Sequence, residues 1–310
     1  MSELLETRER IKEFFIKNEL YVMPVIRFLL ALIVLLVING EMGYMSALGN
    51  PMIVIMAALL CGFLPINITV GISCLFLVGN CYALSLEVAA VALFLIFIMY
   101  LLYFRFGTKD AYIMLLVPLA FLCKIPYVVP LLIGLMATPA SIVSMAFGII
   151  IYYFCTFVTA NSGVLSSASS TDIVGKLTLL IENLLSDKMM ILLLIAFMAT
   201  ALVTYLIRRL NIDYVWNTAS IVGSLTNLLV ILAGEFMLNT SASVGSMIVS
   251  IVVSCAIVVV LQFLVFSVDY SRTEYVQFED DEYYYYVKAV PKMTVSTPSK
   301  RVQRINPQEK

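Results

Sequence analysis

Charged side chains are scarce in this chain, so the few inside its apolar middle are the first candidates for chemistry. Lys124 is the only lysine between Lys109 and Lys176, and it lies between apolar runs beside Pro126. An ionisable group inside a membrane segment needs a partner and is a functional hypothesis by default. We expect Lys124 either to hold an anionic group of a solute or to reach the membrane interface, and the sequence leaves both open.

Two glutamates are the candidate counter-charges for Lys124. Glu87 and Glu235 lie near the expected outer ends of apolar segments, whereas Glu41 is assigned to a loop. A buried ammonium beside either carboxylate would form an ion pair that a transported solute could disturb.

Polar side chains also follow Pro65, which breaks another apolar run. Asn67 and Thr69 stand directly after it. They would either line a polar path or bond the backbone groups that a break leaves free. The predicted solute path therefore comprises the two prolines and the side chains already described: Lys124, Pro65, Asn67, Thr69, Pro126, Glu87 and Glu235.

Residue types missing from the sequence exclude several kinds of site. There is no histidine, which excludes His-based acid–base catalysis and His-ligated metal. The six cysteines lie in apolar segments without a CxxC pair, which favours small buried side chains over disulfides or metal ligands. No HExxH, GxSxG or P-loop pattern appears. We therefore expect no enzymatic activity, no metal and no cofactor.

Composition places the chain in a membrane. Hydrophobic residues make up 62% of the sequence, charged residues 13%, and the mean hydropathy is +1.01. Soluble domains carry about 25% charged residues, so we predict an all-α polytopic integral membrane protein whose first partner is the lipid bilayer. The net charge of −1 gives no indication of nucleic-acid binding.

Six apolar segments are long enough to span a bilayer. They are Tyr21–Ile38, Leu86–Phe104, Ala140–Val158, Met189–Ile207, Tyr214–Leu238 and Val244–Val268. Two pairs of shorter segments stand among them: Met52–Leu64 with Ile68–Cys81, and Ala111–Cys123 with Tyr127–Ala137. At 1.5 Å per residue these fall short of about 30 Å of hydrocarbon. Each pair is thus either a re-entrant hairpin or a pair of thin, tilted crossings.

Each short pair is followed by a long segment, which makes two similar units over residues 51–104 and 110–158. The first unit begins outside and the second inside, so the pattern predicts an inverted repeat within a transmembrane domain of residues 21–268. Inverted repeats with broken helices are typical of secondary transporters, which bind solute where the breaks meet. We therefore expect Pro65 and Pro126 to lie close together.

The distribution of Lys and Arg predicts that both termini are cytoplasmic. With that orientation, only Lys124, Lys176 and Lys188 lie outside the cell or in the membrane. This asymmetry is the one that the positive-inside rule requires. We expect a multi-pass protein of the plasma (cytoplasmic) membrane.

The regions outside the spans have their own patterns. Residues 1–20 predict an amphipathic cytoplasmic helix, either on the membrane surface or as a solvated lead-in. The external loop, residues 159–188, contains apolar residues at helical spacing from Ile173 to Leu184. In the cytoplasmic tail, residues 269–310, two β-prone runs flank an acidic turn, which predicts a hairpin over residues 273–290.

These patterns favour a small-solute or ion transporter, or a channel component, with its site at the helix breaks. The alternative is a membrane scaffold or complex subunit without transport activity. Its cytoplasmic tail would bind partners or a second copy through the hairpin Thr273–Val290.

Overall fold

The structure is a computed structural model. It describes residues 10–11, 13–106, 110–166, 173–210, 212–238, 244–265, 274–280 and 282–289. The chain divides into two compact units: Leu20–Gln262 form one, and Met1–Glu19 together with Phe263–Lys310 form the other.

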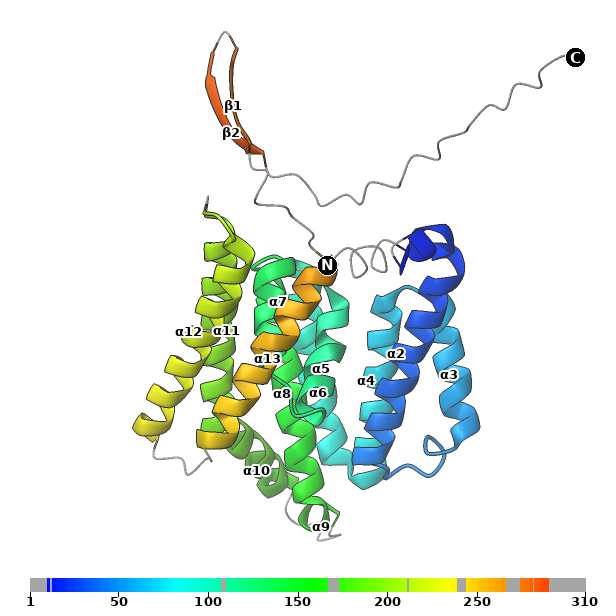
Figure 1. Cartoon of the computed structure of the whole chain (residues 1–310). Helices are drawn as coiled ribbons and strands as arrows, with labels where there is room; N and C mark the ends of the chain where they lie inside the picture. The colour runs from blue at the N-terminus through cyan, green and yellow to red at the C-terminus, as the bar shows by residue number, and fades with distance from the viewer. Residues whose placement is uncertain are drawn as a thin grey trace, which may run out of the picture. The chain divides into compact units, whose positions relative to one another are not determined.

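The larger unit is a bundle of helices (Figure 1). Its elements are α2 (Glu19–Glu41), α3 (Pro51–Phe63), α4 (Ile66–Leu84), α5 (Leu86–Phe106), α6 (Ala111–Leu122), α7 (Val128–Met136), α8 (Ser141–Ala160), α9 (Ser162–Leu165), α10 (Ile173–Ser186), α11 (Lys188–Arg208), α12 (Val215–Leu238) and α13 (Val244–Val265). Within the described residues, seven of these are long and apolar enough to cross a membrane: α2, α4, α5, α8, α11, α12 and α13.

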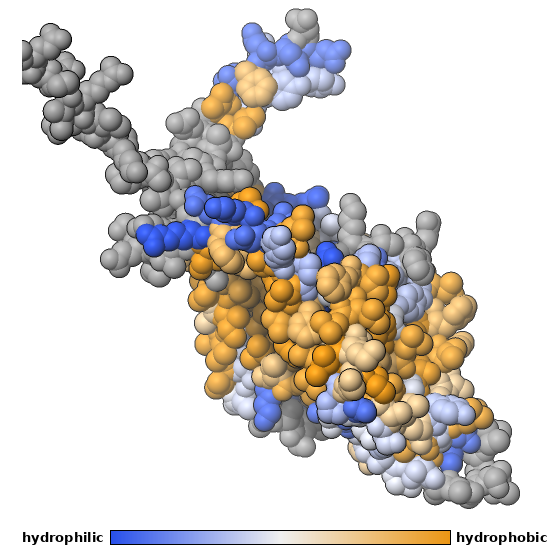
Figure 2. Space-filling model, turned by 90° about the vertical axis from the view of Figure 1, so that its right-hand side faces the viewer, coloured by the Kyte–Doolittle hydropathy of each residue, from blue (hydrophilic) through white to orange (hydrophobic). Residues whose placement is uncertain are grey.

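The outer surface of the bundle is apolar, as a lipid-facing surface must be. Large hydrophobic side chains stand exposed on several helices, among them Leu60, Phe94, Leu229 and Val252. Figure 2 shows hydrophobic residues over the middle of one face and hydrophilic residues towards its ends. An exposed apolar area of this extent marks a membrane surface rather than a soluble one. The chain is therefore a multi-pass membrane protein.

One predicted short segment is a full-length helix, so the expectation of six long spans is corrected to seven. The segment Ile68–Cys81 extends to α4, which has 19 residues. Pro65 stands at its N-cap, where a missing N–H costs nothing, and Ser85 ends it. The polar Asn80 does not break the helix because its amide donates to the carbonyl of Phe76, 3.0 Å away.

The other three short segments stay short. Helix α3 has 13 residues, α6 has 12 and α7 has 9. The two predicted units are therefore built differently: one pair has a full-length second helix, and the other has a second helix of two and a half turns. The inverted repeat is not shown by the structure.

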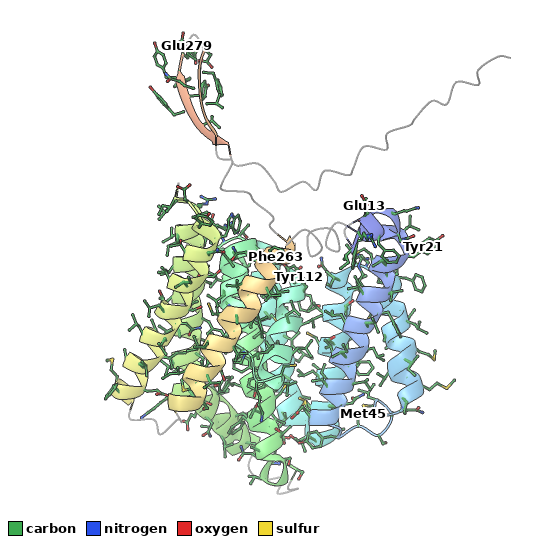
Figure 3. The ribbon with its side chains drawn as sticks, viewed as in Figure 1. Glu13, Tyr21, Met45, Tyr112, Phe263 and Glu279 are labelled. Carbon is green, nitrogen blue, oxygen red and sulfur yellow. The ribbon has the colours of Figure 1, made fainter. Side chains whose placement is uncertain are left out.

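The bundle has two ends, which are named here after a charged residue at each. At the Arg208 end α6 begins and α11 finishes; at the Glu41 end α2 and α8 finish (Figure 1). Figure 3 labels Tyr112, in the first turn of α6, at one end and Met45, in the loop after α2, at the other.

Helices α6 and α7 form a hairpin attached at the Arg208 end. Asp110, before α6, accepts a hydrogen bond from Ser141, the first residue of α8. Arg208 donates to the carbonyls of Leu135 and Ala137, at the end of α7. Both ends of the hairpin are thus fixed at the same end of the bundle, and its turn points into the bundle.

Close helix packing holds the return arm of this hairpin. A Cβ atom added at Gly134 of α7 would lie 2.5 Å from the Cβ of Thr204 in α11, and one at Gly223 of α12 would overlap the Thr204 hydroxyl. Helices α7, α11 and α12 therefore meet at Thr204. Small residues allow such close approach between membrane helices.

The predicted external loop contains helix α10, in agreement with its periodicity. Leu180 and Leu184 of α10 are buried, whereas Ile181 and Leu185 are exposed. The helix packs against α5 and α8. An apolar stripe on one side of a surface helix produces this pattern.

In the smaller unit the predicted hairpin is confirmed. Strands β1 (Glu274–Glu279) and β2 (Tyr284–Ala289) pair antiparallel. Residues 10–11 and 13–17 are helical, in agreement with the N-terminal prediction. Residues 1–9 and 12 of that predicted helix, the hairpin ends Thr273 and Val290, and the basic end of the tail lie outside the described residues.

Candidate functional site

The candidate site begins at the turn of the α6–α7 hairpin. Helix α6 ends at Leu122 with Cys123 as its C-cap, Lys124 adopts a left-handed backbone with φ of 60°, and Tyr127 precedes α7. A positive φ is uncommon for a side chain of this size. It allows the chain to reverse within five residues, and it leaves the Lys124 side chain exposed.

An aromatic cluster lies around this turn. Phe121 stacks on Tyr152 of α8, with ring centroids 4.4 Å apart, and packs against Phe197 of α11 at 6.0 Å. Tyr127 meets Phe197 edge to face at 5.8 Å. Phe197 is fully buried and stands in the middle of α11. The turn of the hairpin therefore packs on an aromatic cluster that includes Phe197, in the middle of α11.

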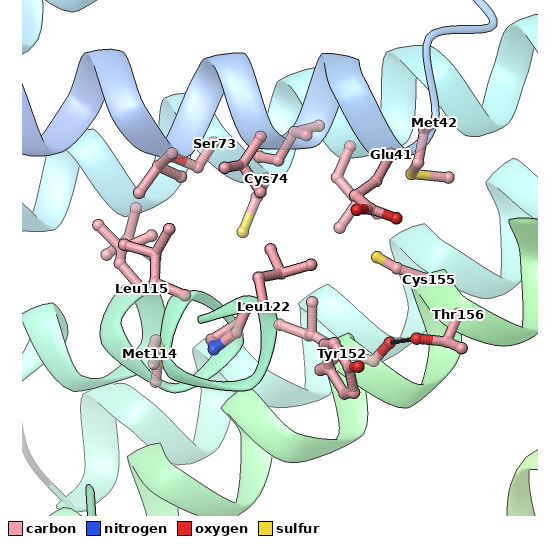
Figure 4. A pocket seen from close by; sticks show the side chains of 18 of the residues that line it. Glu41, Met42, Ser73, Cys74, Met114, Leu115, Leu122, Tyr152, Cys155 and Thr156 are labelled. Atoms are coloured by element: carbon pink, nitrogen blue, oxygen red, sulfur yellow. Dashed lines mark hydrogen bonds between the residues drawn. The ribbon is translucent and has the colours of Figure 1, made fainter. Parts of the chain in front are cut away.

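A cavity of about 100 Å³ lies beside the outgoing arm of the hairpin (Figure 4). Five helices line it: α2, α4, α5, α6 and α8. The lining residues are Val34, Val37, Ile38, Glu41, Met42, Val70, Ser73, Cys74, Leu77, Met99, Met114, Leu115, Pro118, Leu119, Leu122, Ile151, Tyr152, Cys155, Thr156 and Thr159.

The two ends of the cavity differ in polarity. Figure 4 shows Leu115, Met114 and Cys74 towards one end, and Glu41 with Thr156 towards the other. Glu41 carries the only charge among the lining residues. Tyr152 links the cavity to the hairpin turn, because it lines the first and stacks on Phe121 beside the second.

The structure does not pair Lys124 with either predicted counter-charge. No ion pair joins it to Glu87 or Glu235 among the described residues. Glu87 stands in the first turn of α5, at the Glu41 end, within electrostatic range of Lys176. Glu235 lies near the end of α12, within electrostatic range of Tyr127.

Pro65 and Pro126 stand in turns whose neighbouring segments pack against different helices. The turn at Pro65 joins α3 to α4, and Gly62 just before it packs against Pro24 and Phe28 of α2. The arm that follows Pro126 packs against α11 and α12 instead. In Figure 1 the labels of α3 and α7 stand on different sides of the bundle.

The polar residues near Pro65 have structural contacts. The amide oxygen of Asn67 accepts a hydrogen bond from the Tyr103 hydroxyl at 3.0 Å, which ties α4 to α5. Thr69 is buried, and its carbonyl accepts from Ser73 at 2.9 Å. The Thr69 hydroxyl has no hydrogen-bond partner among the described residues. Asn67 lines a second pocket together with Tyr103, and neither Asn67 nor Thr69 lines the cavity beside α6.

Three buried polar side chains in α12 and α13 have atoms without a hydrogen-bond partner among the described residues: Asn227, Glu235 and Ser254. Asn227 and Ser254 are fully buried, and Glu235 is 6% exposed. Burying a polar group without a hydrogen-bond partner is costly, so these three side chains mark a polar interior in this part of the bundle. No group of three or more Cys, Asp or Glu in the described part of the chain is placed to hold a metal ion.

Sequence patterns missed the cavity and several of its residues. Glu41 was assigned to a loop, but it is the last residue of α2 and lines the cavity. One signal was present: Glu41 is the only charged residue between Arg27 and Glu87. The thiols of Cys74 and Cys155 gave no such signal because cysteine is common in apolar segments.

Comparisons of the chain with protein-family models, with curated proteins and with solved structures find no significant match.

Proposed function

We propose that the chain moves a small solute or ion across the membrane, as a transporter or as a component of a channel. The α6–α7 hairpin is the observation that carries this proposal. Its arms of 12 and 9 residues are about 18 and 14 Å long, too short to cross about 30 Å of hydrocarbon. In this proposal it is a re-entrant hairpin with its turn inside the membrane.

A turn at such a depth needs a protein-lined or wet environment. Lipid cannot bond the backbone groups that the turn leaves free, so broken helices occur where protein or a cavity surrounds them. Transporters use such discontinuous helices to hold solutes. The aromatic cluster and the cavity beside α6 give this turn the surroundings that a solute path requires. The proposal does not depend on an inverted repeat.

Lys124 is the proposed solute-binding charge. It stands at the turn, its side chain is exposed, and no ion pair engages it among the described residues. Its ammonium would meet an anionic group of the solute. The alternative, that the ammonium only reaches the interface, remains an outcome of the test.

The proposed orientation places the Arg208 end in the cytoplasm. Arg27, Arg208 and Arg209 lie there, and Lys17 precedes α2, whereas Lys176 and Lys188 are the cations of the opposite end among the described residues. This is the asymmetry of the positive-inside rule. The path would then open from the Glu41 end towards the hairpin turn.

Flux measurements in proteoliposomes test the proposal. The purified full chain is reconstituted, and uptake is recorded for Na⁺, K⁺, Cl⁻ and a panel of labelled small carboxylates. We expect protein-dependent uptake of at least one of them, reduced at least tenfold by Lys124→Ala and partly retained by Lys124→Arg.

Lys176→Ala is the matched control, because Lys176 lies in α10 and donates to the Leu165 carbonyl at 3.2 Å, away from the turn. If flux is equal in the parent and in both Lys124 variants, Lys124 does not bind the solute and its ammonium only reaches the membrane interface. Absence of protein-dependent flux for every ion and carboxylate would count against transport.

A second candidate function is supported by the β-hairpin of the smaller unit. Its pairs Val276–Val287 and Phe278–Tyr285 share one face of the two strands, and all four side chains are exposed. An isolated two-stranded hairpin is marginally stable in water. Partner binding or self-association through this face would make the chain a subunit of a larger assembly.

Deletion of residues 274–289 separates this function from transport. A scaffold loses co-purifying protein, or falls in oligomer mass, while the bundle remains folded and inserted. Unchanged partners and mass after the deletion would remove the support for the scaffold.

A further inference from the structure

Apart from the Tyr152 hydroxyl and two weakly donating thiols, the wall of the cavity offers a guest no free hydrogen-bond donor. The Ser73 hydroxyl donates to the Thr69 carbonyl at 2.9 Å, and the Thr156 hydroxyl donates to the Tyr152 carbonyl at 3.0 Å. Thr159 likewise donates within its own helix, to the carbonyl of Thr156. The Ser and Thr hydroxyl protons on the wall are therefore used inside their own helices, and the remaining lining, apart from Tyr152 and Glu41, is almost wholly aliphatic, thioether or thiol.

Such a wall suits hydrocarbon better than water. A cavity of about 100 Å³ is large enough to hold several water molecules. Each buried water needs two to four polar partners, and apolar cavities of similar size stay dry and bind hydrocarbon. In a membrane, the hydrocarbon at hand is an alkyl chain.

The shape of the cavity sets the direction of that chain. Along α2 the lining extends from Val34 to Glu41, about 10 Å of helix. The inner end is closed by Met114 and Leu115, and the other end reaches Glu41, where α2 and α8 both finish (Figure 4). A guest with a polar head would therefore place the head at Glu41 and its tail towards α6.

Charge at the Glu41 end selects the head. The Glu41 carboxylate is exposed and has no ion-pair or hydrogen-bond partner among the described residues. The same end of the bundle carries Glu87, Glu182 and Asp187 against Lys176 and Lys188. An excess of carboxylates at a cleft attracts cations and repels anions.

From these observations we infer that the cavity binds a single alkyl chain of an amphiphile whose cationic head, an ammonium, lies beside Glu41. This names a solute class for the cavity next to the hairpin. Only the movement of this amphiphile across the membrane depends on the proposed function. Its binding in the cavity does not. Lys124 has no part in it, because Lys124 does not line the cavity.

Photolabelling of the full chain in lipid nanodiscs tests the inference. The probe is decylamine with a diazirine in its alkyl chain, and labelled residues are located by peptide mass spectrometry. We expect saturable labelling of the α6 and α8 walls, near Leu115 and Cys155. An excess of decylammonium should reduce it at least fivefold, decanol should reduce it less, and decyl sulfate least.

Two variants test the head and the tail separately. Glu41→Gln should make decanol and decylammonium equal competitors. Cys155→Leu narrows the cavity and should reduce wall labelling severalfold. Cys255→Leu is its matched control, because Cys255 is also half-buried but lies in α13, outside the cavity.

Three results would overturn the inference. They are labelling spread evenly over the lipid-facing helices, decyl sulfate competing as well as decylammonium, and a cation preference that survives Glu41→Gln. The first two are read on the parent chain, so they hold even where a variant does not fold. Saturable labelling of the cavity wall without flux of any solute would contradict the proposed transport but not the alkyl-chain site. Flux of a polar solute, with labelling spread evenly over the helices, would contradict the alkyl-chain site but not transport.

Discussion

Arg208, the last residue of α11, donates a hydrogen bond to the main-chain carbonyl of Leu135, one residue before the end of α7. A second bond joins it to the Ala137 carbonyl at 3.5 Å. The last carbonyls of a helix lack partners within the helix, and a cation there also meets the negative end of the helix dipole. Arg208 thus caps the short return arm of the hairpin from a neighbouring helix.

Removal of this cap should loosen the hairpin. Arg208→Ala leaves the Leu135 and Ala137 carbonyls without a charged donor, and bonds to charged groups contribute about 1.5–3 kcal/mol each. We expect a lower thermal midpoint in detergent and faster hydrogen exchange in α7.

Arg209→Ala is the control, because the Arg209 guanidinium stacks only over the Tyr205 ring, 4.7 Å from its centroid. That contact contributes about 0.5–1 kcal/mol at an exposed site. If the thermal midpoint falls equally in Arg208→Ala and Arg209→Ala, the hydrogen bonds from Arg208 to the α7 carbonyls do not stabilise the hairpin.

The contacts at Thr204 predict a second, steric sensitivity. Ala at Gly134 would bring its Cβ to 2.5 Å from the Thr204 Cβ, so α7 and α11 must separate or Thr204 must move. Overpacking of this kind costs about 1–3 kcal/mol. We expect Gly134→Ala and Gly223→Ala to lower the free energy of unfolding, measured by denaturation in mild detergent.

Gly245→Ala is the matched control, because no atom outside its own helical turn lies within 4 Å of an added Cβ there. Its stability should stay the same or rise, since alanine favours a helix by up to about 1 kcal/mol over glycine. Thr204→Ala should partly restore Gly223→Ala, because the atom nearest to the Cβ added at Gly223 is the Thr204 hydroxyl oxygen, which alanine removes. A Gly134→Ala protein as stable as Gly245→Ala would mean that the three helices are not close-packed in solution.

Local sequence patterns predicted the secondary-structure elements that are determined by neighbouring residues in the chain. The β-prone runs around Asp280, the periodicity of Leu180 and Leu184, and the proline at the turn before Tyr127 each depend on neighbouring residues. The structure bears them out with shifts of one or a few residues. Helix α4 was predicted too short at its start because Asn67 was assigned to the break; its amide oxygen instead accepts a hydrogen bond from Tyr103 of α5, a partner that no local pattern reveals.

The candidate site was less predictable for the same reason. The turn at Pro126 was indicated by its sequence, but the cavity arises where side chains of five helices fail to fill the space between them. Packing of that kind depends on tertiary contacts. The pairing of Arg208 with Leu135, 73 positions apart, also follows from the fold and has no signature in either segment.

The Asn39–Asn80 contact predicts how the loop after α2 is held. The Asn80 amide donates to Asn39 at 3.2 Å and accepts from the Met45 N–H at 3.2 Å, while Asn39 donates to the Leu48 carbonyl at 2.6 Å. Asn80 is fully buried. Asn80→Leu would leave the Met45 N–H without its acceptor, a loss of about 1–3 kcal/mol.

Hydrogen exchange in residues 43–50 measures this effect. We expect exchange to accelerate at least tenfold in Asn80→Leu. The same substitution at Asn183, an exposed residue of α10 that bonds only the carbonyl of Leu179, should leave that loop unchanged. Equal exchange in the two variants would show that the loop is held by other contacts.

Asp280 predicts a pH dependence of the β-hairpin. Its carboxylate accepts from the N–H groups of Glu282 at 3.0 Å and Tyr283 at 2.7 Å, and from the Tyr285 hydroxyl at 2.9 Å. These bonds, led by the backbone ones, lower the pKa of Asp280 below its ordinary value. A lowered pKa means that the carboxylate stabilises the turn at neutral pH, and that this stabilisation is lost as the pH falls through the folded-state pKa, below about 4.

The test follows the amide protons of β1 and β2 in the full chain by hydrogen exchange between pH 6 and pH 2, after correction for the intrinsic exchange rate. We expect protection to fall at the acid end. Asp280→Asn keeps an oxygen that accepts from the backbone but does not titrate, so its protection should be lower at pH 6 and flat with pH. The difference between the two proteins isolates Asp280 from every other acid in the chain. A parent protein whose hairpin protection stays constant down to pH 2 would show that the Asp280 contacts do not hold the turn.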